Sequence, residues 1–83
     1  MRYEKVYVGV GVWFLQDGGL RPFEIIWTDG TRYKIDKIKF IDRRLPKVGS
    51  LSSKRYTVMI HGVERHLFYE SEIERWFVEK RII

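Results

Sequence analysis

Hydrophobic and polar residues alternate along most of this chain with the two-residue period of β-strands. The clearest case runs from Tyr3 to Leu15, where apolar side chains recur at every second position from Val6 to Phe14. β-Branched and aromatic residues dominate the later strand candidates as well, and these residue types favour a pleated, half-buried surface. The pattern predicts an all-β chain of five to six strands with no substantial helix.

The strongest single prediction is a long hairpin over Arg21–Ile41, centred on the turn Thr28-Asp29-Gly30. A three-residue loop places Gly30 in a left-handed conformation, which glycine adopts without steric cost. The same loop sets Ile25 opposite Tyr33, so that apolar side chains collect on one face of the hairpin. A two-residue loop would mix apolar and charged residues on each face, and we therefore predict the three-residue loop.

The apolar alternation changes parity between Ile35 and Ile38. An extra residue near Asp36-Lys37 would restore it, and such a β-bulge bends its strand. A bent strand can serve both sides of a small barrel. We therefore expect a small antiparallel barrel or a strongly curled sheet of the SH3-like kind. A curled sheet that pairs with a second copy of the chain is the alternative.

The second half of the chain predicts another hairpin and a closing strand. Arg55–Ile60 and Val63–Tyr69 flank a two-residue turn at His61-Gly62, and Trp76–Lys80 forms the last strand. The proline, glycine and serines of Asp42–Lys54 predict a long loop. Residues on the apolar parity of each strand are expected to form one core: Val8, Val10, Val12, Ile25, Ile35, Ile38, Phe40, Val58 and Leu67.

The composition fits one domain over residues 1–83, with 45% hydrophobic residues. The chain has no cysteine, which excludes disulfides and thiolate metal sites. No apolar run approaches the roughly 20 residues of a membrane helix, and the first residues lack the character of a signal peptide. We expect a cytoplasmic protein with no membrane partner and no cofactor.

The residues that could carry catalysis do not form a recognisable set. A hydrolase triad needs a nucleophile, a base and an orienting acid, but the serines fall in a predicted loop and His61 in a turn. His66 belongs to an exposed strand face, and two histidines with Glu64 are a poor set of zinc ligands. The glutamates between Glu70 and Glu74 are typical of a solvated acidic turn. We predict that the chain is not an enzyme.

Positive charge is concentrated in one part of the chain, whose net charge is +5. The segment Lys34–Arg55 carries eight basic and two acidic residues, or +6, and the remainder carries −1. Phosphate backbones attract such segments through counterion release, and aromatic side chains beside them can stack on bases. We therefore predict weak, sequence-independent nucleic-acid binding through a basic strand-and-loop stripe. Its members are Lys37, Lys39, Arg43, Arg44, Lys47, Lys54 and Arg55.

A protein-interaction module or a self-associating domain is the alternative function. The basic middle and the acidic stretch Glu64–Glu79 could attract a charged protein partner or a second copy of the chain. The alternation puts the side chains of Tyr7, Trp13 and Phe68 on the face opposite to the predicted core, and we expect one or more of them to be exposed. Exposed aromatics beside the basic stripe would favour nucleic acid; aromatics away from it would favour a protein partner. A solvated basic edge that prevents edge-to-edge pairing is a third interpretation.

Several strand motifs together resemble a family of short, uncharacterised β proteins of Gram-positive anaerobic bacteria. The motifs are Trp27–Asp36, Arg55–Val58, Gly62–Glu64, Leu67–Glu70 and Arg75–Glu79. The resemblance covers nearly the whole chain and implies a complete protein. No activity is assigned to the family, so the resemblance implies no catalytic residue.

Overall fold

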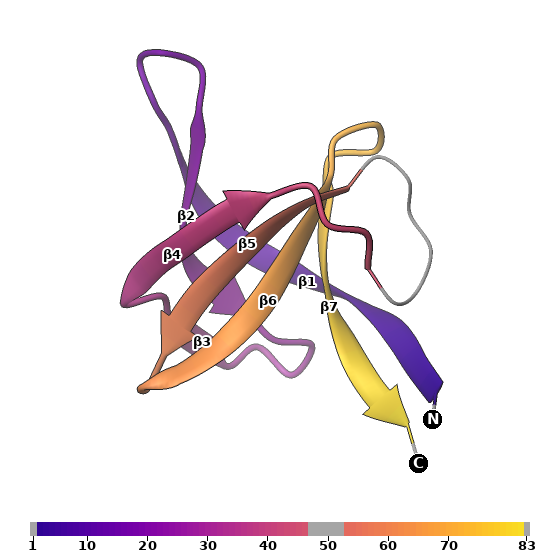
Figure 1. Ribbon diagram of the computed structural model, residues 1–83. Helices are drawn as coiled ribbons and strands as arrows, with labels where there is room; N and C mark the ends of the chain where they lie inside the picture. The colour runs from indigo at the N-terminus through magenta and orange to yellow at the C-terminus, as the bar shows by residue number, and fades with distance from the viewer. Residues whose placement is uncertain (1, 47–52, 83) are drawn as a thin grey trace.

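The computed structural model describes residues 2–46 and 53–82, which form seven β-strands and no helix. The strands are β1 (Arg2–Phe14), β2 (Leu20–Ile26), β3 (Arg32–Lys34), β4 (Lys37–Asp42), β5 (Ser53–Ile60), β6 (Val63–Glu70) and β7 (Arg75–Ile82). They form one sheet in the order β3-β2-β1-β7-β6-β5-β4, and all neighbours in it are antiparallel. The sheet is strongly curled (Figure 1), which confirms the predicted all-β, antiparallel architecture.

The described strands number seven instead of five to six because one predicted strand is divided into β3 and β4. β3 pairs with β2, whereas β4 pairs with β5 at the other end of the sheet order. At the junction the Ile35 amide donates to the Phe23 carbonyl (2.9 Å) and the Asp36 amide to the Met59 carbonyl (2.8 Å). Two consecutive residues thus hydrogen-bond to β2 and to β5, near opposite ends of the sheet order, and the predicted bend closes this side of the sheet into a half-barrel.

Phe40 was predicted in the core, and the structure shows that this prediction is wrong. The register of β4 against β5 shifts after Ile38, so that Ile38 lies opposite Val58 but Phe40 opposite Thr57. The extra residue, Lys39, turns Phe40 onto the outer face of the sheet, where it is 60% exposed. The other eight predicted core residues belong to the core cluster of the inner face or pack against it.

Both predicted hairpin registers are confirmed. Ile25 lies opposite Tyr33, and Gly30 has a φ of +90°, which a side chain would strain. At the second hairpin, His61 and Gly62 both have positive φ, as a two-residue turn of this kind requires. β5 and β6 then pair along their full length. Local turn chemistry therefore sets the register of both hairpins.

A second cluster of buried residues lies on the outer face of the sheet. Phe68 and Phe77 lie opposite each other on β6 and β7, with rings stacked 5.0 Å apart and exposures of 2% and 0%. Tyr7 on β1 meets Phe77 edge-on at 6.0 Å. Its hydroxyl donates to the carboxylate of Glu70 (2.7 Å), which also accepts from Lys5 Nζ (3.4 Å). Of the three aromatics considered for exposure, Phe68 is therefore buried.

The hydroxyl of Tyr56 is buried in the core without a hydrogen-bond partner among the described residues. Burial raises the pKa of Tyr56 above its ordinary value. An unpaired buried hydroxyl carries a desolvation cost, whereas the ring itself packs against Trp76 with centroids 5.2 Å apart. We expect Tyr56→Phe to raise the free energy of unfolding by about 1 kcal/mol, measured by urea denaturation. A clear loss of stability would contradict this expectation.

Candidate functional site

The fold neutralises part of the predicted basic stripe. Arg55 Nη2 lies 2.8 Å from Asp42 Oδ2, and Lys39 Nζ lies 3.0 Å from Glu64 Oε1. Hydrogen bonds from the Arg55 guanidinium hold the pKa of Asp42 below its ordinary value. Because both cations are already paired with carboxylates, they contribute less than isolated cations to the attraction of a phosphate.

The remaining members of the stripe differ in their exposure. Lys54 is half-buried, with its ammonium 5.7 Å from the centroid of an aromatic ring of the core. Lys37, Arg43 and Arg44 are exposed, and no side-chain ion pair links them to other described residues. Lys47 lies outside the described residues. Three predicted cations thus remain available on the described surface.

Trp13 is the most exposed of the three aromatic residues outside the predicted core. Phe68 is buried, and Tyr7 is half-buried beneath the guanidinium of Arg75, whose Cζ lies 3.7 Å from the ring centroid. Trp13 is 61% exposed. It belongs to the hairpin of β1 and β2, which extends beyond the rest of the sheet (Figure 1).

Trp13 and Phe23 form an aromatic pair in a shallow groove of about 450 Å³, which we name the aromatic groove. Their ring centroids are 5.3 Å apart and their planes are inclined by 34°. Phe23 reaches this position because the β1–β2 register shifts after Gly11, over which the ring lies; a Cβ at Gly11 would come within 2.6 Å of it. Arg21 and Lys37 also line the groove. A cation of the predicted stripe therefore lies beside an exposed aromatic pair.

A larger cavity of about 650 Å³, which we name the inner cavity, opens where β6 and β7 separate. These strands pair only between Phe68–Glu70 and Arg75–Phe77, and then diverge (Figure 1). β6 stays paired with β5, and β7 with β1. The wall of the half-barrel is therefore open between Val63–Leu67 of β6 and Val78–Ile82 of β7.

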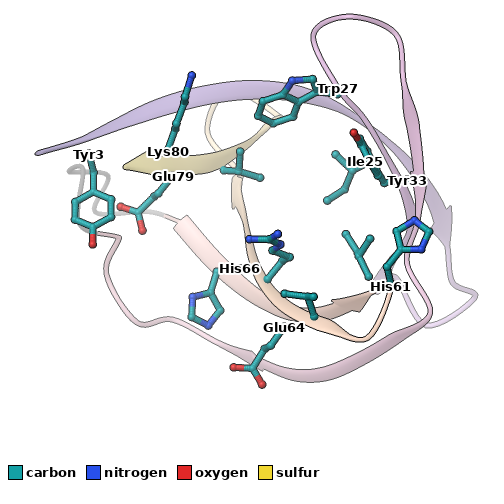
Figure 2. Close-up of a pocket in the computed structure, with 13 residues that line it drawn as sticks. Tyr3, Ile25, Trp27, Tyr33, His61, Glu64, His66, Glu79 and Lys80 are labelled. Atoms are coloured by element: carbon teal, nitrogen blue, oxygen red, sulfur yellow. The ribbon is translucent and has the colours of Figure 1, made fainter. Parts of the chain in front are cut away.

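The interior of this cavity is mostly apolar. Its lining includes Ile25, Trp27, Tyr33, Ile60, Val63 and Val78. Figure 2 shows Ile25, Trp27 and Tyr33 facing the enclosed space, whereas Glu64 and His66 point away from it. Sequence reasoning missed the cavity because its lining has the apolar parity of an ordinary core. The one available signal was Arg65, which interrupts the apolar parity of its strand.

The described residues contain no group of three or more histidine, cysteine, aspartate or glutamate side chains that could hold a metal ion. They also form no helix of the length and apolarity needed to cross a membrane. Partial burial lowers the pKa of His66, and the charge of Arg55 acts in the same direction, so His66 is mainly neutral near pH 7.

The groove combines rings with cations, and the cavity combines an apolar interior with an arginine. The family resemblance of the strand motifs stays a prediction. No model of a protein family, no curated protein and no solved structure matches the chain.

Proposed function

We propose that this protein is a small SH3-like binding module that binds single-stranded nucleic acid at the aromatic groove, weakly and without sequence preference. The observation that carries the proposal is the exposed pair of Trp13 and Phe23 beside Arg21 and Lys37. Aromatic rings stack on bases of any sequence, and neighbouring cations contact phosphates. The groove supplies both kinds of contact within one surface.

The cations at the far end of β4 extend this surface. Lys37 begins β4, and Arg43 and Arg44 follow its last residue. Strand residues rise roughly 3.3 Å each, so the two ends lie about 20 Å apart. A single strand of a few nucleotides can span that length, with a base on the aromatic pair and phosphates near the cations.

The number of available cations predicts the salt dependence of binding. Four cations are counted as phosphate contacts: Arg21, Lys37, Arg43 and Arg44. Lys39 and Arg55 are already paired with carboxylates, Lys54 is half-buried over an aromatic ring, and Lys47 lies outside the described residues. For single strands, the logarithm of affinity falls by about 0.7 per contact for each tenfold rise in salt. We therefore expect a slope of roughly −3, compared with roughly −5 if all seven residues of the stripe took part.

Trp13→Ala tests the role of stacking. A base stacked on an aromatic ring contributes about 1–3 kcal/mol, so affinity for a single-stranded oligonucleotide should fall roughly 5- to 100-fold. Affinity for a duplex of the same sequence should change little, because its bases are already stacked within the helix. Fluorescence anisotropy of labelled oligonucleotides in about 50 mM salt measures both affinities. Phe14→Ala is the matched control, since Phe14 is 84% exposed on the same hairpin but lies outside the groove.

The paired reversal Arg43→Glu and Arg44→Glu separates charge from stacking. It should lower the affinity for single strands and for duplexes equally, because both residues would act through phosphates only. It should also make the affinity depend less steeply on salt concentration. Both side chains are exposed, so the fold should tolerate the change. A wild-type protein that binds no oligonucleotide at about 50 mM salt would rule out nucleic-acid binding through this surface.

Protein interaction is the second candidate function, favoured by the same hairpin. Phe14 and Leu15 are 84% and 44% exposed, and large apolar side chains in such positions commonly anchor a protein partner or a second copy of the chain. Sedimentation of the wild type and of Phe14→Ala tests self-association. Phe14→Ala distinguishes the two functions, because it should weaken a protein contact and leave oligonucleotide binding unchanged.

A further inference from the structure

Arg65 occupies an unusual position on the inner face of β6. It lies opposite the fully buried Val58 and lines the inner cavity, while the next inner-face residue, Leu67, is part of the core. No side-chain hydrogen bond or ion pair joins Arg65 to another described residue. A guanidinium has five donors in a planar fork and forms its strongest hydrogen bonds with anions. The cavity therefore presents an uncompensated cation on an apolar wall.

The other charged residues of the cavity differ from Arg65 in their surroundings. Glu64 and Glu79 lie at the mouth of the cavity and belong to the outer faces of their strands, and Glu64 is paired with Lys39. Lys80 belongs to the inner face of β7 but lies opposite Glu4 on β1. Arg65 is thus the inner-face cation of this lining that has no carboxylate opposite it among the described residues.

The shape of the cavity follows from the sizes of the side chains between β6 and β7. At the end where the strands pair, Tyr69 and Trp76 lie opposite each other with ring centroids 4.6 Å apart. At the divergent end, Val63 and Val78 are too small to fill the wider space. The resulting volume, about 650 Å³, is within the roughly 300–1,000 Å³ of small-molecule sites.

We propose that the inner cavity binds a small amphipathic anion that enters between β6 and β7. Its apolar body packs against Trp27, Tyr33 and the neighbouring aliphatic side chains, and its acidic head is bound by Arg65. Carboxylates, which are planar, and sulfonates and phosphates, which are tetrahedral, each present two acceptor oxygens that a guanidinium can bind at once. The inner cavity shares no lining residue with the aromatic groove, so the proposal stands independently of nucleic-acid binding.

Two dyes with the same aromatic body test the proposal. Anilinonaphthalene sulfonate carries an acidic head, whereas N-phenylnaphthylamine lacks it, and both fluoresce more strongly in apolar surroundings. The wild type should bind the sulfonate more tightly than the neutral dye. Arg65→Gln should lower the affinity for the sulfonate roughly tenfold or more and leave the affinity for the neutral dye unchanged, because only the charge-assisted contact is lost. Arg43→Gln removes a surface cation and should leave both affinities unchanged.

A cavity-filling change tests the apolar part of the site. Val78→Phe should lower the affinity for both dyes. Circular dichroism and thermal denaturation check that the variant is folded. Val63→Phe, at the partly exposed mouth, replaces it if Val78→Phe does not fold. The proposal is overturned if the sulfonate shows no saturable binding below about 1 mM, if Arg65→Gln weakens both dyes equally, or if Trp13→Ala abolishes binding and so places the dye at the exposed hairpin.

Discussion

Phe77→Ala is expected to lower the free energy of unfolding by about 3–5 kcal/mol, a large part of the stability of a domain of this size. Phe77 has no exposed surface, stacks on Phe68 and meets Tyr7 edge-on. The ammonium of Lys5 lies 4.6 Å from the centroid of its ring. Truncation would leave a cavity beneath these three side chains, and the strands of the sheet cannot move together to fill it.

Phe40→Ala is the matched control for this prediction. The sequence pattern placed Phe40 in the core, whereas in the structure it is 60% exposed. Its truncation should therefore cost less than about 1 kcal/mol. Urea denaturation of both variants measures the difference. Equal losses of stability would show that the outer-face cluster around Phe77 contributes no more than a surface residue.

Glu70→Ala is the second change with a large expected effect, a loss of about 3 kcal/mol. The carboxylate is largely buried and accepts hydrogen bonds from Tyr7 and Lys5. Its removal would leave the Lys5 ammonium, whose side chain is 17% exposed, without this partner. A poorly solvated charge that loses a buried partner costs more than the ion pair contributes, so the single change is more harmful than the loss of one contact.

A double variant and a surface control make this prediction specific. Lys5→Met combined with Glu70→Leu removes both charges and should be less destabilising than Glu70→Ala alone. Glu72→Ala, in the exposed turn between β6 and β7, should change stability by less than about 0.5 kcal/mol. If the double variant were the least stable of the three, the pairing of Lys5 with Glu70 would not explain the effect.

The alternation of residues and the turn motifs of the sequence were enough to predict both hairpins and most of the strands, although not the division of one strand into β3 and β4. A strand exposes its side chains with a period of two, so one register brings Ile25 to Tyr33 and any other separates them. Gly30 has the positive φ that its residue type predicted, and the second hairpin has the predicted two-residue turn at His61-Gly62. These features depend on residues close together in the chain, and local rules therefore predict them.

The positions of the irregularities were decided by tertiary structure. The sequence indicated a bend near Asp36-Lys37, but the further shift after Ile38, which exposes Phe40, depends on how β4 pairs with β5. A similar shift after Gly11 turns Phe23 toward Trp13 and creates the aromatic groove. A bulge changes the face of every later side chain in its strand, so one unpredicted residue redistributes buried and exposed positions.

Charge pairing and the two openings also required the three-dimensional arrangement. Lys39 and Glu64 are 25 residues apart and form an ion pair on the folded surface, so a count of basic residues could not show that Lys39 is neutralised. The sequence by itself determined most of the strands, both hairpin turns and which part of the chain is basic. Only the tertiary structure decided that both faces of the sheet bury aromatic residues and that β6 and β7 separate around Arg65. The physical reason is that strand alternation is a property of neighbouring residues, whereas burial, neutralisation and cavities depend on which strands the curled sheet brings together.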